Sequence, residues 1–577
     1  MKKSLSSLFA KNHGMRDAID AIPQITLVTP NFHKEKARKK ISTDLPREHW
    51  QGYDRHPFEF LTAVIGFLAP LNREELLAAK RLEMTDGIRR LVCGIINKNY
   101  VRYLAEEEFP VPEQRRKTLS ASLQILEQIA ISYKHLFRDG LKNVRKYDEK
   151  SIPLVMECGF RIMEIILVLQ RLYALSNRPL PRHFWAELNQ IFMASYLLQD
   201  ALTSYEITGF LKIGRSRDAD RVVYSGDQPK NALHLYLSVQ FFGLCDAFSW
   251  PPQYLHLFEA YISMLRTEGM INIYRGENLE DGQLIIFSDQ NRSPSLLLNS
   301  KRKAPAIIVD LIPMHKLITT DQNAVQQNAG KPISPALATL VDTDRIPFLQ
   351  LVRKRLHPQI RMENRLPSND KCYLRLFHGF RECHHPLSSL SEDRYSIYLK
   401  KNMLSHLLAE KSAGIAEDED SVDAGRWYTM DESPGGLRVR TRETQFTSNI
   451  FMGQMVAYQK LDEGTNSKPM LGYICRIQRL EDNDLDLAIT KLSTYGEGIF
   501  LRDPAAGMEG GVIIGYLAHQ DAKRWMLIVH AKFRIKKGKT LIMERGNRQQ
   551  KVTIGNPVIT QREFICYHLQ ATTSDKK

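Results

Sequence analysis

The stretch DESPGGLRVR, residues 431–440, opens with an acid, a serine, a proline and two glycines, and then changes texture. From Leu437 to Arg440 every second residue is an arginine and the residues between them are apolar, which is the pattern of a half-buried strand. Pro-Gly-Gly is typical of a sharp turn, and glycine also lets another group come close to the backbone. The stretch therefore predicts a tight turn at the mouth of a β-strand.

The same β texture extends over the C-terminal third of the chain. Strand-like runs separated by polar turns follow at 371–380, 426–430, 450–461, 470–480, 485–492, 511–518, 524–533, 539–545, 551–554 and 562–569. We expect six or seven strands to form one antiparallel barrel within residues 336–518, preceded by a connecting helix and carrying a helical and acidic insertion at 387–425. Residues 519–577 are predicted to form an additional β lobe.

The N-terminal half is patterned as helices. Residues 118–137, for example, carry apolar side chains at steps of three and four, and similar runs fill residues 46–268. Short β-like runs follow in 269–335, and the polar stretch 319–335 is predicted to be a linker. Residues 1–45, with a basic run at 33–43, are predicted to be a flexible arm.

These patterns define the expected fold class. We predict a multidomain α+β protein, with a helical N-terminal region arranged as a bundle or an irregular solenoid. An antiparallel β-barrel with an additional β lobe is predicted to follow it.

Composition limits the classes of function. The chain has 577 residues, 43% of them hydrophobic, and its 80 Lys and Arg exceed its 65 Asp and Glu by 15 charges. Such an excess suits an anionic partner such as a nucleotide, a nucleic acid or a membrane surface. The most apolar run, at 165–169, is too short to span a bilayer and is flanked by charges, so we expect a cytoplasmic protein without a membrane span.

Motifs for catalysis and for metal binding are sparse. The seven cysteines form no CxxC pair, and Cys383-His384-His385 has no second cluster of metal ligands nearby in the sequence. The motifs of P-loop enzymes, serine hydrolases, zinc proteases and kinases are missing as well. We therefore predict a protein that is not an enzyme, with no catalytic residues, metal or cofactor.

A pair of motifs frames the predicted barrel. RMENR, residues 361–365, places Arg361 and Arg365 before the first barrel strand, and Asp431-x-Ser433-x-x-Gly436 opens a later one. In these residues, and in strand pattern over about 361–518, the sequence resembles the PilZ family. The Gly453 turn and the Gly472 strand entry are also similar to that family.

The resemblance implies a ligand and a binding site. PilZ domains bind cyclic di-GMP on the barrel surface, with the RxxxR segment wrapped over it, which assigns Arg361 and Arg365 to its phosphates and guanines. Planar guanidinium groups suit both, because they donate paired hydrogen bonds and stack on purines. Asp431, Ser433 and Gly436 are assigned to a guanine base, and Gly435 and Gly436 leave room for it.

The resulting interpretation is a bacterial cyclic di-GMP receptor that repositions a helical region which binds an unidentified protein partner. Two alternatives remain open. One is a PilZ-like scaffold that has lost its ligand and serves protein–protein interaction. The other is a basic nucleic-acid-binding protein, which the few aromatic residues beside Lys or Arg on the strands, such as Tyr458 and Trp525, make less favoured.

Overall fold

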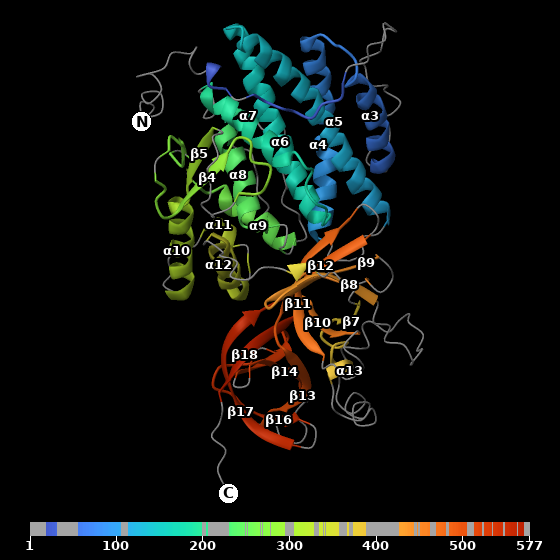
Figure 1. The fold of residues 1–577 in the computed structure, drawn as a ribbon, viewed down its shortest axis with the longest axis vertical. Helices are drawn as coiled ribbons and strands as arrows, with labels where there is room; N and C mark the ends of the chain where they lie inside the picture. Colours follow the sequence, from blue (N-terminus) through green and yellow to red (C-terminus); the bar gives the residue numbers. More distant parts are fainter. Residues whose placement is uncertain are drawn as a thin grey trace. The chain divides into compact units, whose positions relative to one another are not determined.

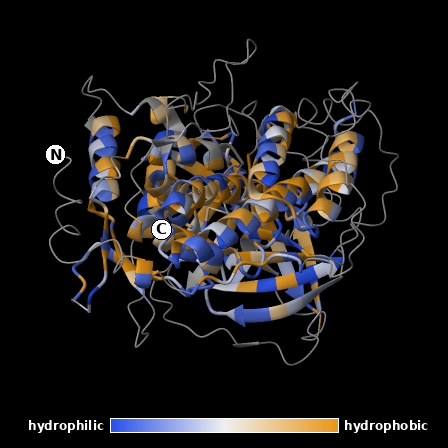
Figure 2. Cartoon of the chain, turned by 90° about the horizontal axis from the view of Figure 1, so that it is seen from above, coloured by the Kyte–Doolittle hydropathy of each residue, from blue (hydrophilic) through white to orange (hydrophobic). Residues whose placement is uncertain are grey.

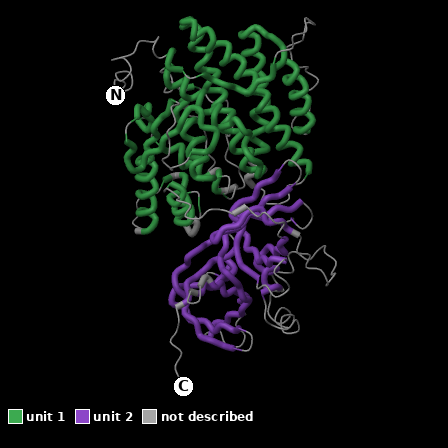
Figure 3. Tube along the Cα trace, in the orientation of Figure 1, with its two compact units in different colours: residues 1–107, 111–360 green, residues 108–110, 361–577 purple. Residues whose placement is uncertain are grey.

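The structure is a computed structural model, and it divides the chain into two compact units. The first comprises residues 1–107 and 111–360, and the second residues 108–110 and 361–577 (Figure 3). The residues it describes are 19–31 without 23, 56–105, 113–198, 204–205, 230–294 without 248–249, 251, 266, 268 and 277, 305–327, 334–356 without 339 and 341, 366–367, 373–387, 426–442, 447, 450–461, 469–480, 484–504, 513–521, 524–545 without 534, 548–561 and 563–570.

The first unit is built mainly of helices, as the sequence predicted (Figure 1). Its principal helices are α3 (Pro57–Leu71), α4 (Ala78–Ala105), α5 (Glu113–Val144), α6 (Ile152–Leu175), α7 (Phe184–Leu197), α8 (Ala232–Leu244) and α9 (Pro252–Ile262). The apolar residues of α5 that recur at three- and four-residue steps are all buried. Figure 2 shows hydrophobic and hydrophilic stretches alternating along the helices, which is how an amphipathic helix hides one face.

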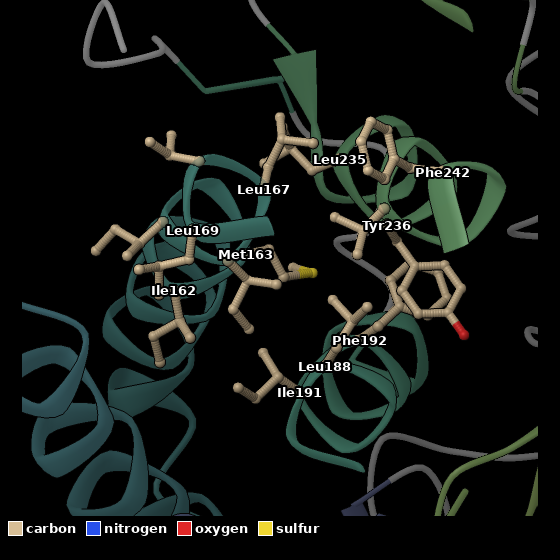
Figure 4. Close-up of a cluster of buried hydrophobic side chains, with 14 of the residues drawn as sticks. Ile162, Met163, Leu167, Leu169, Leu188, Ile191, Phe192, Leu235, Tyr236 and Phe242 are labelled. Carbon is tan, nitrogen blue, oxygen red and sulfur yellow. The ribbon is translucent and has the colours of Figure 1, made fainter. Parts of the chain in front are cut away.

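Helices α6, α7 and α8 share a dense apolar core (Figure 4). The rings of Phe192 on α7 and Tyr236 on α8 stack with their centroids 3.8 Å apart. Leu188 and Ile191 are fully buried beside them, and Ile162 and Met163 of α6 are buried opposite. Helix α6 is therefore a core helix that is surrounded by other helices over most of its length.

The charges that interrupt α6 are paired inside this core. Glu164 accepts from Arg89 and Arg161, each at 3.3 Å. Arg171 has no exposed side-chain surface, lies 3.4 Å from Glu259, and stacks its guanidinium 3.7 Å from the ring centroid of Phe242. Each buried charge thus has a counter-charge, without which burial would be very unfavourable.

The first unit continues through residues 269–356. A small sheet has the order β3-β5-β4, formed by β3 (Ile271–Ile273), β4 (Gln283–Phe287) and β5 (Ala306–Asp310). The helices α10 (Ile312–Gln327), α11 (Pro335–Ala338) and α12 (Asp342–Leu356) follow. Residues 319–327 of the predicted linker are thus helical, as the continuation of a helix whose first turns bury Met314 and Ile318. Within them, buried Asp321 accepts from the Tyr261 hydroxyl and the Ser334 N–H.

Part of the predicted N-terminal arm also packs on this unit. Ile19 and Ile22 belong to its buried core, and Ile25 and Leu27 pack against that core. The basic run 33–43 lies outside the described residues. The apolar residues at 19, 22, 25 and 27 thus anchor the described part of this segment on the unit.

The second unit contains two closed antiparallel barrels, the first of which lies within residues 373–491. Its strands close in the order β7-β10-β11-β12-β9-β8, where the pairing of β8 with β9 completes the ring. They are β7 (Tyr373–His378), β8 (Arg426–Ser433), β9 (Gly436–Arg442), β10 (Met455–Lys460), β11 (Met470–Arg479) and β12 (Asp484–Lys491). A short strand, β6 (Leu366–Pro367), pairs with residues 431–432 of β8, beyond the part of β8 that pairs with β7.

The second barrel follows without a long connection. Its strands close in the order β13-β14-β15-β18-β17-β16. They are β13 (Tyr495–Arg502), β14 (Ile513–Asp521), β15 (Arg524–His530), β16 (Thr540–Arg545), β17 (Arg548–Thr560) and β18 (Phe564–Gln570).

The strands β13 and β14 therefore pair in the second barrel, whereas the predicted first barrel extends to residue 518. The predicted strands include the β14 region but not β13, and alternation identifies a strand but not its partner. The residues from 519 onward, predicted as an additional β lobe, complete this second barrel.

Within the second unit the two barrels share an apolar cluster. Phe377, Met455 and Leu471 of the first barrel pack with Tyr516 and Phe564 of the second. The carboxylate of Glu563 accepts from the backbone N–H groups of Phe380 at 2.9 Å and Met455 at 2.7 Å.

Among the described residues, no helix is long and apolar enough to cross a bilayer.

The α6–α7–α8 core can be tested with a matched pair of leucines. We expect Leu188→Ala, at a fully buried position, to lower the free energy of unfolding by about 2–5 kcal/mol because it leaves a cavity. Leu77→Ala, at a position 80% exposed, should change it by no more than about 0.5 kcal/mol. Urea unfolding followed by far-UV circular dichroism measures both, and equal losses would contradict the packing described.

Candidate functional site

The hairpin of β8 and β9 carries the D-x-S-x-x-G motif. Asp431 and Ser433 lie at the end of β8, Gly436 begins β9, and residues 434–435 form the turn between them. In the strand register Ser433 faces Gly436 and Asp431 faces Arg438. The turn at the mouth of a strand that the sequence predicted is therefore present.

The two glycines of this turn have different surroundings. A Cβ on Gly436 would lie 2.8 Å from the carbonyl oxygen of Ile489 on β12, so the close approach of two strands requires glycine here. A Cβ on Gly435 would meet nothing within 4 Å. The packing of β9 on β12 therefore explains the glycine at position 436. The space beside Gly435, in contrast, is open to a ligand.

Ser433 stabilises the turn that it precedes. Its hydroxyl donates to the carbonyl oxygen of Gly436 at 3.2 Å, across the mouth of the hairpin. A hydroxyl donates one hydrogen bond and accepts up to two, so the same oxygen retains the chemistry to accept from a ligand.

Asp431 forms an ion pair across the hairpin. Its Oδ2 lies 2.9 Å from Nε of Arg438, which the register places directly opposite. The Asp431 side chain is 13% exposed and that of Arg438 is 41% exposed. The sequence identified Arg438 as an outward-facing residue of the strand but did not reveal this pairing.

Two further ion pairs border the hairpin, and sequence reasoning missed both. Glu432 lies 2.7 Å from Nζ of Lys491 and 3.2 Å from Nζ of Lys460. Burial disfavours its ionised form, but the hydrogen bonds and charges of the two lysines outweigh burial and lower the pKa of Glu432. Arg440 donates twice to Asp486, at 2.6 and 3.0 Å, and this raises the pKa of Arg440.

An aromatic side chain lies beside these charges. Tyr428 on β8 is 41% exposed, faces Arg440 in the register, and has its ring centroid 5.0 Å from that of Tyr373. An exposed ring next to cationic side chains is able to stack on a nucleobase. The sequence carried a signal for it, since Tyr428 lies in the aromatic run RWYTM just before the motif.

The other motif residues, Arg361 and Arg365, lie outside the described residues. The strand that follows them is described. β6 pairs antiparallel with β8, with Leu366 opposite Glu432 and Pro367 opposite Asp431. The residue directly after Arg365 is therefore anchored to the strand that carries Asp431.

The Cys383-His384 pair occupies an interior position. The Cys383 thiol is fully buried and donates to the carbonyl oxygens of Phe377 and Met455, at 3.5 and 3.7 Å. Burial, together with the charges of Glu563 and Glu382, raises the pKa of this thiol. In the described part of the chain, no group of three His, Cys, Asp or Glu side chains is placed to hold a metal ion.

Substitutions of the two turn glycines test how closely β9 approaches β12. We expect Gly436→Ala to destabilise the barrel by about 1–3 kcal/mol, because its Cβ would press on the backbone of β12. Gly435→Ala, which adds a methyl group in open space, should stay within about 0.5 kcal/mol of wild type. Urea titrations compare the two; a Gly436→Ala variant as stable as wild type would show that β9 and β12 do not approach so closely.

The Glu432 cluster predicts a pH dependence. Because the folded-state pKa of Glu432 is lowered, its ionised form stabilises the fold fully above the unfolded value of about 4.3, and this contribution is lost as the pH falls through the folded pKa. We expect Glu432→Gln to be less stable than wild type by up to about 1 kcal/mol at neutral pH. The difference in the free energy of unfolding between Glu432→Gln and wild type should become smaller below about pH 4, where Glu432 is protonated in wild type.

Lys491→Met is the matched partner variant, because it removes a counter-charge of Glu432. Its difference in stability from wild type should also become smaller at low pH. Free energies of unfolding measured by urea titration at several pH values provide the comparison. A Glu432→Gln difference that does not change with pH would contradict the assignment.

A model of a known protein family matches part of the chain. The model described as the N-terminal domain of the cyclic-di-GMP receptor FimW matches residues 54–267. This span covers the described helices from α3 to α9 and does not extend to the barrels. Neither a curated protein nor a solved structure matches the chain. The helical region is thus similar to the N-terminal domain of a cyclic-di-GMP receptor.

Proposed function

We propose that the chain is a non-enzymatic bacterial receptor for cyclic di-GMP. The first barrel, of PilZ type, binds the dinucleotide at the β8–β9 hairpin with Arg361, Arg365, Asp431, Ser433, Gly435 and Gly436. Binding then repositions the helical region, which contacts a protein partner.

The pairing of β6 with β8 is the observation that carries this proposal. Consecutive Cα atoms are about 3.8 Å apart. Leu366 lies opposite Glu432, so the covalent chain keeps Arg365 next to the strand of the acidic motif. Arg361 precedes Leu366 by only five residues. Two guanidinium groups on such a short tether are within reach of one compact dianion at the hairpin.

The hairpin offers complementary groups for a guanine. The Asp431 carboxylate suits the N1–H and N2–H₂ donors of the base, provided that Arg438 shares or releases it. The side chain of Arg438 is 41% exposed, and ion pairs with so exposed a partner contribute only about 0–1 kcal/mol, so this exchange is inexpensive. The open space at Gly435 and the exposed ring of Tyr428 flank the same hairpin.

The family match supports the ligand from an independent part of the chain. The described helices α3–α9 resemble the N-terminal domain of a protein named as a cyclic-di-GMP receptor. A receptor of this kind needs a ligand-binding part and a part that transmits the signal. The barrel motifs supply the first, and we assign the second to the helical region.

The division of the chain suggests how the two parts are coupled. The first unit ends at Ile360 and the main part of the second begins at Arg361, so the RxxxR segment opens the part of the chain that carries the barrels. Fixing this segment on a ligand restricts the connection to α12. A shift of the helical region follows only if the ligand binds one arrangement more tightly than the other.

The nucleic-acid alternative loses part of its support. Tyr458, an aromatic residue that it requires on the surface, is fully buried. Trp525 is partly covered, with His519 at 4.6 Å and the Arg545 guanidinium at 5.3 Å from its ring. The ligand-free scaffold alternative is decided by the binding measurement below.

Isothermal titration with cyclic di-GMP tests the proposal. We expect the full chain to bind, and Arg361→Ala combined with Arg365→Ala to weaken binding at least about 100-fold. Each lost set of charge-assisted hydrogen bonds contributes about 1.5–3 kcal/mol, and about 2.7 kcal/mol corresponds to a factor of 100.

Arg353→Ala combined with Arg355→Ala is the matched control. It removes the same charge from the chain, but these arginines bond Gln322 and Asp246 in the first unit, so affinity should stay within about twofold of wild type. Tight binding that survives loss of Arg361 and Arg365 would refute the site, and an absence of binding by wild type would favour the scaffold alternative.

A further inference from the structure

Residues 531–539, here called the β15–β16 loop, cross one end of the second barrel. β15 and β16 are not neighbours in that barrel, because β18 and β17 lie between them, so their connection passes over the ends of both. The N–H of Ala531 donates to the carbonyl oxygen of Glu563, just before β18, at 2.8 Å, and the N–H of Gly538 donates to that of Ile554 on β17 at 2.8 Å. The loop is therefore fixed to the barrel near both of its ends.

The middle of the loop is held by one apolar side chain. Ile535 packs against the apolar interior of the barrel, and its N–H donates to the Tyr567 hydroxyl at 3.2 Å. Gly538 has a φ of +81°, a conformation that favours glycine where the chain turns into β16. Phe533, two residues before Ile535, is 38% exposed. The loop thus presents an aromatic ring to solvent on a backbone that is held in place.

The β15–β16 loop is also strongly basic. Its sequence, AKFRIKKGK, has five Lys and Arg and no Asp or Glu, although Arg534 lies outside the described residues. Lys539 forms an ion pair with Asp503 at 2.5 Å. Three other exposed lysines form no ion pair within the part of the chain that the structure describes: Lys532, Lys536 and Lys537.

This cluster of positive charge does not help the barrel to fold. Like charges close together repel one another, and burial together with the charge of Lys532 lowers the pKa of His530. In the first barrel, by contrast, Lys460 and Lys491 share the carboxylate of Glu432. Basic side chains that have no carboxylate of their own, beside an exposed aromatic ring, suit an anionic partner outside the chain.

We propose that the β15–β16 loop docks the protein on the surface of an anionic lipid bilayer. The lysines attract the negatively charged headgroups, and the ring of Phe533 enters the boundary between headgroups and acyl chains. Proteins that bind single-stranded nucleic acid use basic grooves that follow its backbone, whereas these cations lie together on one short segment. The loop belongs to the second barrel and includes no residue of the proposed nucleotide site.

Sedimentation with lipid vesicles tests the proposal on the full chain without cyclic di-GMP. Vesicles of phosphatidylcholine with phosphatidylserine are compared with vesicles of phosphatidylcholine alone. We expect binding to the anionic vesicles only, and weaker binding as salt is added. Lys532→Gln combined with Lys536→Gln and Lys537→Gln should weaken this binding at least about 10-fold, because each lysine near an anionic surface adds to the attraction.

A matched variant removes the same charge from the first unit. It combines Lys80→Gln, Lys146→Gln and Lys316→Gln, three exposed positions. Vesicle affinity should stay within about twofold of wild type, because these charges lie outside the loop and are screened by salt. Equal losses in the two triple variants would show that net charge alone attracts the protein, and would overturn the proposal.

Phe533→Trp reports whether the ring enters the bilayer. With brominated phosphatidylcholine in the anionic vesicles, we expect stronger quenching of its tryptophan emission than in wild type. A variant that binds the vesicles without this added quenching contradicts the insertion of Phe533.

Labelled single-stranded RNA, followed by fluorescence anisotropy, distinguishes the other anionic partner. RNA binding that the lysine substitutions in the loop abolish, together with no binding of wild type to anionic vesicles, would overturn the membrane in favour of nucleic acid. A wild-type chain that binds neither probe overturns the proposal as well. None of these outcomes depends on whether the first barrel binds cyclic di-GMP.

Discussion

The backbone ladder of β8 is the interaction on which the candidate site depends. This one strand pairs with β7, β9 and β6, so that it closes the first barrel and anchors the segment that follows Arg365. Closure removes the free edges that a sheet would otherwise present. It also places the acidic motif and the residue that follows the arginine motif on paired strands, although Leu366 and Asp431 are 65 positions apart in the sequence.

Local sequence patterns predicted the elements far better than their partners. The alternation after Gly436 predicted β9, and the apolar spacing in 118–137 predicted α5. The strand at 495–502 was not among the predicted strands. That the strand at 513–521 belongs to a second barrel was not predictable, because both barrels are antiparallel and alternate alike. The helix over 319–327 was missed because this polar stretch is typical of a linker, whereas it continues a helix that begins at Ile312 and buries Asp321 against Tyr261.

The candidate site shows the same division. The sequence identified Asp431, Ser433 and the two glycines, because residues of these types are typical of a turn. It did not identify the acceptor role of Asp431 toward Arg438, or the cluster of Glu432 with Lys460 and Lys491, because these pairs form between strands. Nor did it show that Gly436 is required by the backbone of β12, a constraint that exists only once the strands pair.

The ion pairs of the barrel also bear on how a dianion would be recognised. The chain has a net charge of +15, yet four basic side chains around the hairpin already face carboxylates: Arg438 faces Asp431, Arg440 faces Asp486, and Lys460 and Lys491 share Glu432. Such a surface attracts a long polyanion weakly, since each phosphate would have to displace an internal partner. In the function proposed above, Arg361 and Arg365 supply the charge for a compact ligand. That proposal favours a small dinucleotide over an extended nucleic acid, because two guanidinium groups that close on one ligand gain little from further phosphates along a strand.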